Sequence, residues 1–216
     1  MTIRVLVADD HGAIRAGLML MLGNDADIEV VGEAADGAAA IRQARALHPD
    51  VVLMDVRMPG TDGIAATRLI VTEGLAEVLV LTTFDLDEYV HAALRAGAAG
   101  FLLKSVEAHR LLEAVKQVAA GDGVLAPTVT RRLISAFAET VAEPPVPPGG
   151  LDELTDRERE VFGCLGSGMS NAQISSRLHI GETTVKTHVS RVLTKLGVRS
   201  RVQAAILAQE FGLVVD

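Results

Sequence analysis

VVLMDVRMPGTDG, residues 51–63, joins a short apolar run to an acidic residue and a turn. The run 51–54 is continuously apolar, which is typical of a strand buried on both faces of a parallel sheet. Asp55 follows the run directly, and the Pro and Gly residues after it indicate a loop. We therefore expect Asp55 at the carboxyl end of a central strand, where open α/β sheets bind their ligands.

Similar apolar runs lie on both sides of this stretch through residue 120, and segments of helical spacing separate them. This alternation predicts a doubly wound α/β domain with a five-stranded parallel sheet covered by helices on both faces. We expect strands at 3–8, 28–33, 51–54, 78–82 and 100–103, and helices at 12–22, 37–47, 62–73, 86–96 and 106–119.

Four further polar residues fall at the ends of the predicted strands: Asp9, Asp10, Thr82 and Lys104. One Asp after a strand is commonly a turn former, but five such residues at corresponding positions indicate a site. Clustered carboxylates repel one another unless a cation lies among them, and their oxygens suit Mg²⁺. A carboxylate of such a site can attack phosphorus if cationic groups offset the charge.

The stretches DD at 9–10, LMDVRMPGTDG at 53–63, VLTT at 80–83 and GFLLK at 100–104 together resemble a bacterial receiver domain of flavodoxin-like fold. The resemblance implies that Asp55 accepts a phosphoryl group from a sensor histidine kinase and that Lys104 pairs with that group. Thr82 and the ring of Phe101 are the implied switch residues. The implied ligands of Mg²⁺ are Asp9 through water, Asp10, Asp55 and the backbone carbonyl of Arg57.

Three details near this site carry their own interpretations. His11 is interpreted as the start of the first helix rather than as a metal ligand. Arg57 and Phe84 are bulky, and we hypothesise that they slow hydrolysis of a phosphoaspartate. Ser105 stands where many receivers have Pro.

The run EPPVPPGG at 143–150 excludes regular hydrogen-bonded structure and predicts an interdomain linker. It divides the chain into a first domain at 1–122, a linker helix and Pro-rich linker at 123–150, and a second domain at 151–216. A helix predicted at 128–140 carries an apolar stripe that either caps the first domain or pairs with a second copy, and capping is favoured.

After the linker the sequence predicts helices alone, at 156–166, 171–178, 183–196 and 200–211, with caps at Thr155 and Ser170. Two of them flank the turn 179–181, which predicts a helix-turn-helix in an all-α domain. Although the net charge of the chain is −8, the segment 177–201 holds six Lys and Arg against the single acid Glu182. Such a surface suits nucleic-acid phosphates.

The stretch LTDREREVFGCLGSGMSNAQISSRLHIGETTVKTHVSRVLTKLGV at 154–198, followed by RSRVQAA, resembles the LuxR-type helix-turn-helix. Gln173 departs from it, because many relatives carry an acid there. The resemblance implies base-reading and backbone-contacting side chains on the third helix of this domain. The base readers are Lys186, Thr187 and Ser190, and the backbone contacts are Thr183, Thr184 and Arg191.

Together the two halves resemble a response regulator of the NarL/FixJ type. This implies a transcriptional regulator that binds double-stranded promoter DNA, forms a homodimer when phosphorylated, and is a phosphoacceptor rather than a metabolic enzyme. The alternative is a regulator that works without phosphorylation, under the control of a partner protein.

Other classes fit the sequence poorly. A dehalogenase-type phosphatase needs a second acid where Arg57 stands, and a quorum-sensing regulator has an aromatic ligand pocket, whereas this chain has no Trp and one Tyr. Cys164 lies among apolar residues and is interpreted as a core residue. No apolar run approaches the ~20 residues of a membrane span, and no signal peptide is evident, so we expect a cytoplasmic protein.

Overall fold

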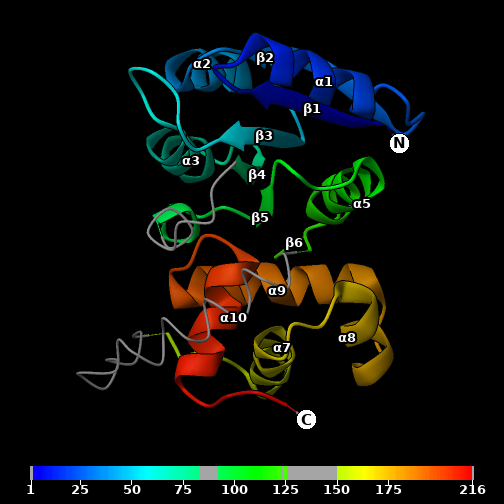
Figure 1. Cartoon of the computed structure of the whole chain (residues 1–216). Coiled ribbons are helices and arrows are strands. Elements are labelled where there is room, and N and C mark those ends of the chain that lie inside the picture. Colours follow the sequence, from blue (N-terminus) through cyan, green and yellow to red (C-terminus); the bar gives the residue numbers. More distant parts are fainter. Residues whose placement is uncertain (1, 83–91, 123, 126–149, 216) are drawn as a thin grey trace.

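The computed structural model describes residues 2–82, 92–122, 124–125 and 150–215 as two lobes stacked one above the other (Figure 1). The N-terminal lobe is a parallel sheet with helices on both faces, and the C-terminal lobe is built of helices. The helix predicted at 128–140 and most of the helix predicted at 86–96, with Phe84 before it, lie outside the described residues. Residues 92–95 are helical.

The sheet contains the five predicted strands with shifts of at most one residue at their ends, in the order β2-β1-β3-β4-β5-β6. All its pairings are parallel. A short strand that was not predicted, β6, pairs with β5 through two residues. The strands are β1 (Ile3–Ala8), β2 (Ile28–Ala34), β3 (Val51–Asp55), β4 (Glu77–Thr82), β5 (Gly100–Leu103) and β6 (Val124–Leu125).

Alternate residues of the strands feed two hydrophobic clusters, because successive side chains of a strand point to opposite faces. Leu6 and Ala8 belong to the cluster beneath α2 (Gly37–Leu47) and α3 (Gly63–Thr72). Val5 and Val7 belong to the cluster beneath α1 (Gly12–Leu22) and α5 (Ala108–Ala119). The strands are therefore buried on both faces, as their continuous apolar sequence predicts.

The C-terminal lobe has its own cluster of buried side chains, and helix caps fix its element boundaries. Thr155 and Ser170 each form a capping box with the residue three positions later, which satisfies two N–H groups at each helix start. Gln173 completes the second box. The helices are α7 (Asp156–Gly166), α8 (Asn171–Leu178), α9 (Glu182–Leu196) and α10 (Arg201–Glu210).

The lobes meet along α9 and α10. In Figure 1, α9 lies directly beneath β6, between the sheet and the rest of the C-terminal lobe. Val202 of α10 is 5% exposed and belongs to the α2/α3 cluster of the N-terminal lobe. The side-chain amide of Gln203 donates to the carbonyls of Leu94 and Arg95 at 2.8 and 3.1 Å. The contact between lobes is thus both apolar and hydrogen-bonded.

Candidate phosphoacceptor site and nucleic-acid interface

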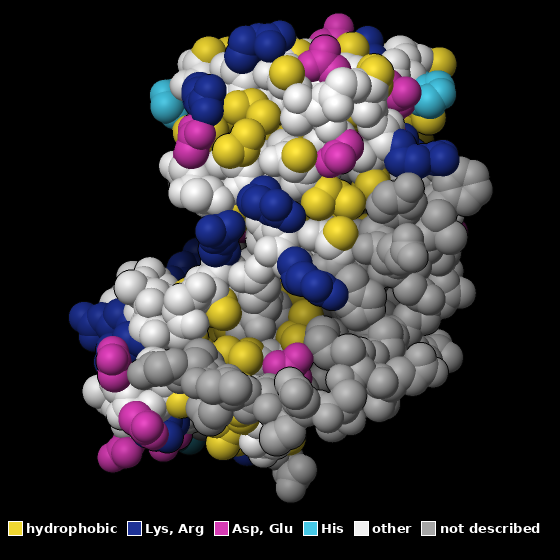
Figure 2. Space-filling model, turned by 90° about the vertical axis from the view of Figure 1, so that its left-hand side faces the viewer, with side chains coloured by type: hydrophobic (Ala, Val, Ile, Leu, Met, Phe, Trp, Pro, Cys, Tyr) yellow, Lys and Arg dark blue, Asp and Glu magenta, His cyan; other side chains and the backbone are white. Residues whose placement is uncertain are grey.

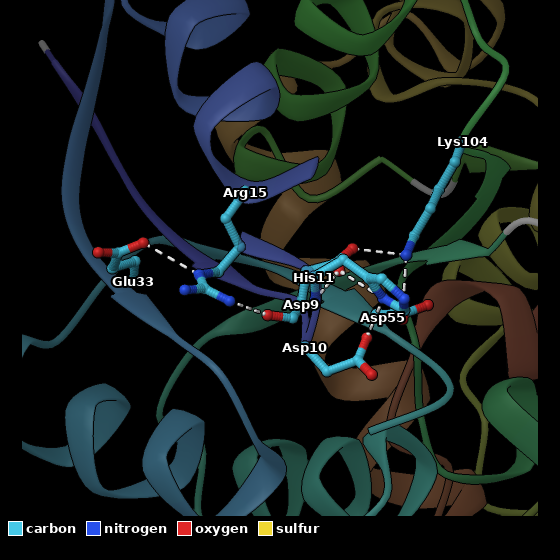
Figure 3. A network of polar contacts seen from close by, with 7 residues as sticks. All are labelled: Asp9, Asp10, His11, Arg15, Glu33, Asp55 and Lys104. Carbon is cyan, nitrogen blue, oxygen red and sulfur yellow. Dashed lines mark hydrogen bonds and ion pairs between the residues drawn. The ribbon is translucent and has the colours of Figure 1, made fainter. Parts of the chain in front are cut away.

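The carboxyl ends of β1, β3, β4 and β5 bring together the acidic and basic side chains that the sequence predicts (Figure 3). Asp9 and Asp10 follow β1, and Asp55 is the last residue of β3. Lys104 follows β5 and reaches back over the strand ends toward both Asp9 and Asp55. The parallel arrangement decides this meeting, because it places all these ends at one edge of the sheet.

Lys104 joins two buried carboxylates. Its ammonium nitrogen lies 2.5 Å from Oδ2 of Asp9 and 3.0 Å from Oδ2 of Asp55. The three side chains are at most 9% exposed, so the pairings are weakly screened by solvent. Burial raises the pKa of the Asp55 carboxyl above its ordinary value, and Lys104 opposes that rise. Two buried carboxylates thus share one buried ammonium group.

Asp9, Asp10 and His11 offer ligand atoms that lie within 4.8 Å of one another. Oδ2 of Asp9 is buried, and the Lys104 ammonium, 2.5 Å away, is its partner. Asp10 is more exposed, and its Oδ1 lies 2.6 Å from Nδ1 of His11. The carboxylate oxygens of Asp9 and Asp10, one buried and one accessible, are the kind of ligand that a hard divalent cation prefers.

His11 is the residue before α1, as expected, but its ring makes no cap and lies against Asp10 instead. Its backbone N–H donates to Oδ1 of Asp9 at 2.9 Å, which fixes that carboxylate. His11 therefore lies at the predicted start of the helix, whereas its contact with Asp10 was not predicted.

Arg15, which was not among the predicted site residues, also supports the acidic turn. Its Nη1 donates to the carbonyl of Asp9 at 2.7 Å, while its Nε donates to Glu33 of β2 at 3.0 Å (Figure 3). Arg15 lies about one turn into α1. In the sequence, only its short distance along the chain from Asp9 and Asp10 could have indicated this contact.

The loop after Asp55 is held close to the strand end. A Cβ atom on Gly63 would lie 1.8 Å from the Asp55 carbonyl oxygen, so only glycine fits there. The Gly63 N–H donates to the carbonyl of Val56 at 2.9 Å. A cleft of about 430 Å³ opens beside this loop and is lined by Asp10 and Arg57. The loop therefore leaves an accessible space next to the acids.

The two predicted switch residues are both buried. Thr82, the last residue of β4, is 2% exposed, and its carbonyl accepts the backbone N–H of Lys104 at 2.7 Å. Phe101 of β5 is fully buried in the cluster that also contains Val202 of α10. The neighbourhood of Phe101 is therefore continuous with the contact between the lobes.

The second predicted site lies on α9, the second helix of the helix-turn-helix. Val185, Val189, Val192 and Leu196 pack into the C-terminal core. All six predicted DNA-contacting side chains are exposed. Those six are Thr183, Thr184, Lys186, Thr187, Ser190 and Arg191.

The N-terminal lobe stands against part of this exposed face. Lys186 and Ser190 line a cleft of about 260 Å³ between the lobes, opposite Glu77 and the segment 120–122. Such a space is far too small for a DNA duplex, whose major groove alone is about 12 Å wide. Figure 2 shows Lys and Arg side chains at the junction of the two lobes. Lys186 and Ser190 therefore face the receiver across this cleft, an arrangement that we call closed.

No helix within the described ranges is long and apolar enough to cross a membrane. Cys164 is buried in the C-terminal core, and burial raises the pKa of its thiol. An unreactive core residue is consistent with both observations.

Two family models match the chain: the response regulator receiver domain over residues 5–116 and the bacterial regulatory proteins of the luxR family over residues 152–208. The chain is 38% identical to the transcriptional regulatory protein LnrK of Bacillus subtilis, covering 99% of both chains. It is 39% identical to the response regulator protein VraR of Staphylococcus aureus, covering 99% of this chain and 100% of that protein.

Among solved structures, the chain resembles the response regulator ChrA of a heme-sensing two-component system, with 39% identity, 99% coverage of both chains and a TM-score of 0.54. These matches span both lobes, and they agree with the geometry of the acidic site and of the helix-turn-helix. The chain therefore belongs to the response regulators that join a receiver domain to a LuxR-type DNA-binding domain and control transcription in a phosphorylation-dependent way.

Proposed function

We propose that Asp55 is the phosphoacceptor of this receiver and that a sensor histidine kinase is the donor. The observation that carries this assignment is the position of Asp55 at the end of β3, 3.0 Å from the Lys104 ammonium and beside the cleft lined by Asp10 and Arg57. An oxygen of Asp55 attacks phosphorus, and the bond between phosphorus and the donor breaks as the new bond forms.

The acids would hold a Mg²⁺ ion through Asp10, Asp55 and the Arg57 carbonyl, with Asp9 acting through water. This ion supplies positive charge that offsets the transferring group. Lys104 moves from its pairing with the carboxylates to the phosphoryl oxygens, and its charge makes it the principal protein counter-ion. Thr82 donates its hydroxyl to the same group, and the chain acts as a phosphoacceptor rather than as a metabolic enzyme.

Phosphorylation adds negative charge and acceptor oxygens at the strand ends, which biases the region around Thr82 and Phe101. Because Phe101 shares a cluster with Val202, a rearrangement there weakens the contact of α10 with the receiver. The face of α9 with Lys186 and Ser190 then becomes accessible to promoter DNA. A homodimer of this form reads two half-sites through α9, as two-fold symmetry allows.

The decisive experiment is incubation with a small phosphodonor and Mg²⁺, followed by intact mass measurement. We expect one added phosphate on the wild-type chain and none on Asp55→Asn or Asp55→Ala. Absence of the added mass on wild type, with retained DNA binding, would instead favour a regulator controlled by a partner protein.

A further inference from the structure

The contact between lobes contains an anion held by two donors of the DNA-binding domain. Oδ1 of Asp122, in the turn between α5 and β6, accepts the backbone N–H of Asn171 at 3.0 Å. The same oxygen lies 3.0 Å from Nη1 of Arg201. The acceptor belongs to the receiver, and both donors belong to the C-terminal lobe.

The two donors are assembled by the C-terminal lobe itself. Nη1 of Arg201 donates to Oδ1 of Asn171 at 2.7 Å, and Nη2 donates to the carbonyl of Met169. These bonds hold the guanidinium at the first residue of α8, and the Arg201 side chain is 10% exposed. The donor pair therefore does not depend on Asp122 for its geometry.

The N–H of Asn171 is available to an acceptor from outside the lobe. The capping box at Ser170 uses the N–H groups of Ser170 and Gln173. The first N–H groups of a helix have no partner within the helix, so that of Asn171 needs another acceptor. In this arrangement, the acceptor is the carboxylate of Asp122.

The donors also lie on the DNA-facing side of the lobe. Asn171 and Arg201 line the same cleft as Lys186 and Ser190 of α9. In helix-turn-helix domains the first helix crosses the DNA backbone while the second enters the major groove. Arg side chains and helix N-terminal N–H groups are frequent donors to DNA phosphates.

We propose that the Asn171 N–H and the Arg201 guanidinium form a contact site for a DNA backbone phosphate, and that Asp122 occupies this site in the closed arrangement. The receiver and the DNA then compete for the same two donors. This inference rests on the proposed docking of α9 on DNA. It adds a second contact with the DNA, in which a backbone phosphate binds to residues outside α9.

The test compares full-length variants for binding to a random-sequence DNA duplex at several salt concentrations. Asp122→Ala removes the competing carboxylate and should bind roughly tenfold more tightly than wild type. Adding Arg201→Gln to Asp122→Ala should weaken binding roughly tenfold and lower the slope of log affinity against log salt by about 0.9, the value for one phosphate contact.

Asp122→Ala with Arg110→Gln is the matched control, because Arg110 is an exposed receiver residue and the net charge changes equally. Its affinity and salt slope should equal those of Asp122→Ala. In the Asp122→Ala chain, Arg201→Lys should keep most of the salt slope that Arg201→Gln loses. A purely structural role of Arg201 would not predict this difference.

A second comparison, made in the Asp122→Ala chain, sets Asn171→Pro against Asn171→Ala. Both variants lose the Asn side chain, but only Pro lacks the backbone N–H, and Pro is tolerated in the first turn of a helix. The Pro variant should bind roughly threefold more weakly. This pair keeps the proposal testable if Arg201→Gln unfolds the lobe.

The proposed phosphate site would be overturned if Asp122→Ala and its double variant with Arg201→Gln, both folded, had the same affinity and salt slope. Arg201 would then be an interdomain contact alone. Failure of every variant, including Asp122→Ala, to bind DNA would overturn the proposed function of α9 as well. The two failures are therefore distinguishable.

Discussion

The ammonium nitrogen of Lys104 lies 3.0 Å from Oδ2 of Asp55, and the two side chains are 9% and 7% exposed. The same nitrogen pairs with Asp9, so one cation offsets two buried carboxylates. Removing one partner of a buried ion pair leaves uncompensated charge, which costs more than the pair itself contributes. This relationship makes Lys104 important for stability before any phosphoryl group arrives.

Lys104→Met should lower the free energy of unfolding by about 3 kcal/mol in a chelator. Saturating Mg²⁺ should restore part of the loss, because the ion replaces the missing positive charge. Urea unfolding followed by circular dichroism, with and without Mg²⁺, measures both effects. Lys104→Arg is the control that keeps the charge, and equal stability of wild type and Lys104→Met in chelator would contradict the role assigned to this pair.

Asp55→Asn should make the protein more stable than wild type at neutral pH in the absence of divalent cations. Burial raises the pKa of the folded-state carboxyl above its ordinary 3.8, so the folded chain binds this proton more tightly than the unfolded chain does. The contribution of Asp55 to stability is therefore present below pH 3.8 and falls as pH rises through the raised pKa.

The free energy of unfolding of wild type and of Asp55→Asn is measured by denaturant unfolding in chelator, from below pH 3.8 to neutral pH. The Asn variant should have the flatter profile. Parallel profiles would mean that Asp55 is not the source of the pH dependence.

Glu158→Gln should destabilise the C-terminal lobe above pH 4.5 by roughly 1–2 kcal/mol, after allowance for solvent screening of Lys195. Lys195, 2.7 Å away, and the Thr155 N–H lower the pKa of Glu158 from 4.5 to about 2. Stability from this group is thus present above pH 4.5 and is lost as pH falls toward 2.

Acid titration of the free energy of unfolding tests this, with Glu160→Gln as the control on the same helix. Glu160 forms an exposed i,i+3 pair with Arg157, and its loss should change stability by less than about 0.5 kcal/mol. A pH profile of Glu158→Gln identical to that of wild type would show that the pair contributes nothing.

Gln203→Ala should open the chain and increase DNA binding without phosphorylation. Its amide donates to receiver carbonyls at Leu94 and Arg95, and a hydrogen bond contributes about 1 kcal/mol, or roughly a fivefold change in the closed-to-open ratio. Small-angle scattering should detect the larger radius of gyration. Gln209→Ala is the matched control, because Gln209 lies on the same helix but donates its hydrogen bond to the Gly166 carbonyl within its own lobe. An equal response of both variants would exclude a specific role of the interdomain bonds.

Gly63→Ala should abolish phosphate uptake at Asp55, because a Cβ would overlap the Asp55 carbonyl oxygen and force the β3–α3 loop away. The cost to stability should be about 3 kcal/mol, as for overpacked core positions. Intact mass after exposure to a phosphodonor reports the uptake, and Gly17→Ala in α1 serves as the comparison, since its Cβ would meet nothing within 4 Å. Normal phosphorylation of Gly63→Ala would refute the close-approach argument.

The sequence by itself determined the order of strands and helices, because apolar runs, helical spacing and capping residues act locally. It also located Asp9, Asp10, Asp55 and Lys104 at one edge of the sheet, since parallel strands with right-handed crossovers leave few topologies. The exposed face of α9 followed from the spacing of Val185, Val189 and Val192 in the same way.

Only the tertiary structure decided which partners those residues have. Lys104 contacts two carboxylates, and Arg15 ties Asp9 to Glu33, because neighbouring strand ends and α1 converge there. Strand β6 depends on its pairing with β5, and the pairing of Asp122 with Arg201 depends on how the two lobes dock. Such contacts join residues far apart in the chain, and no periodicity or local spacing encodes them.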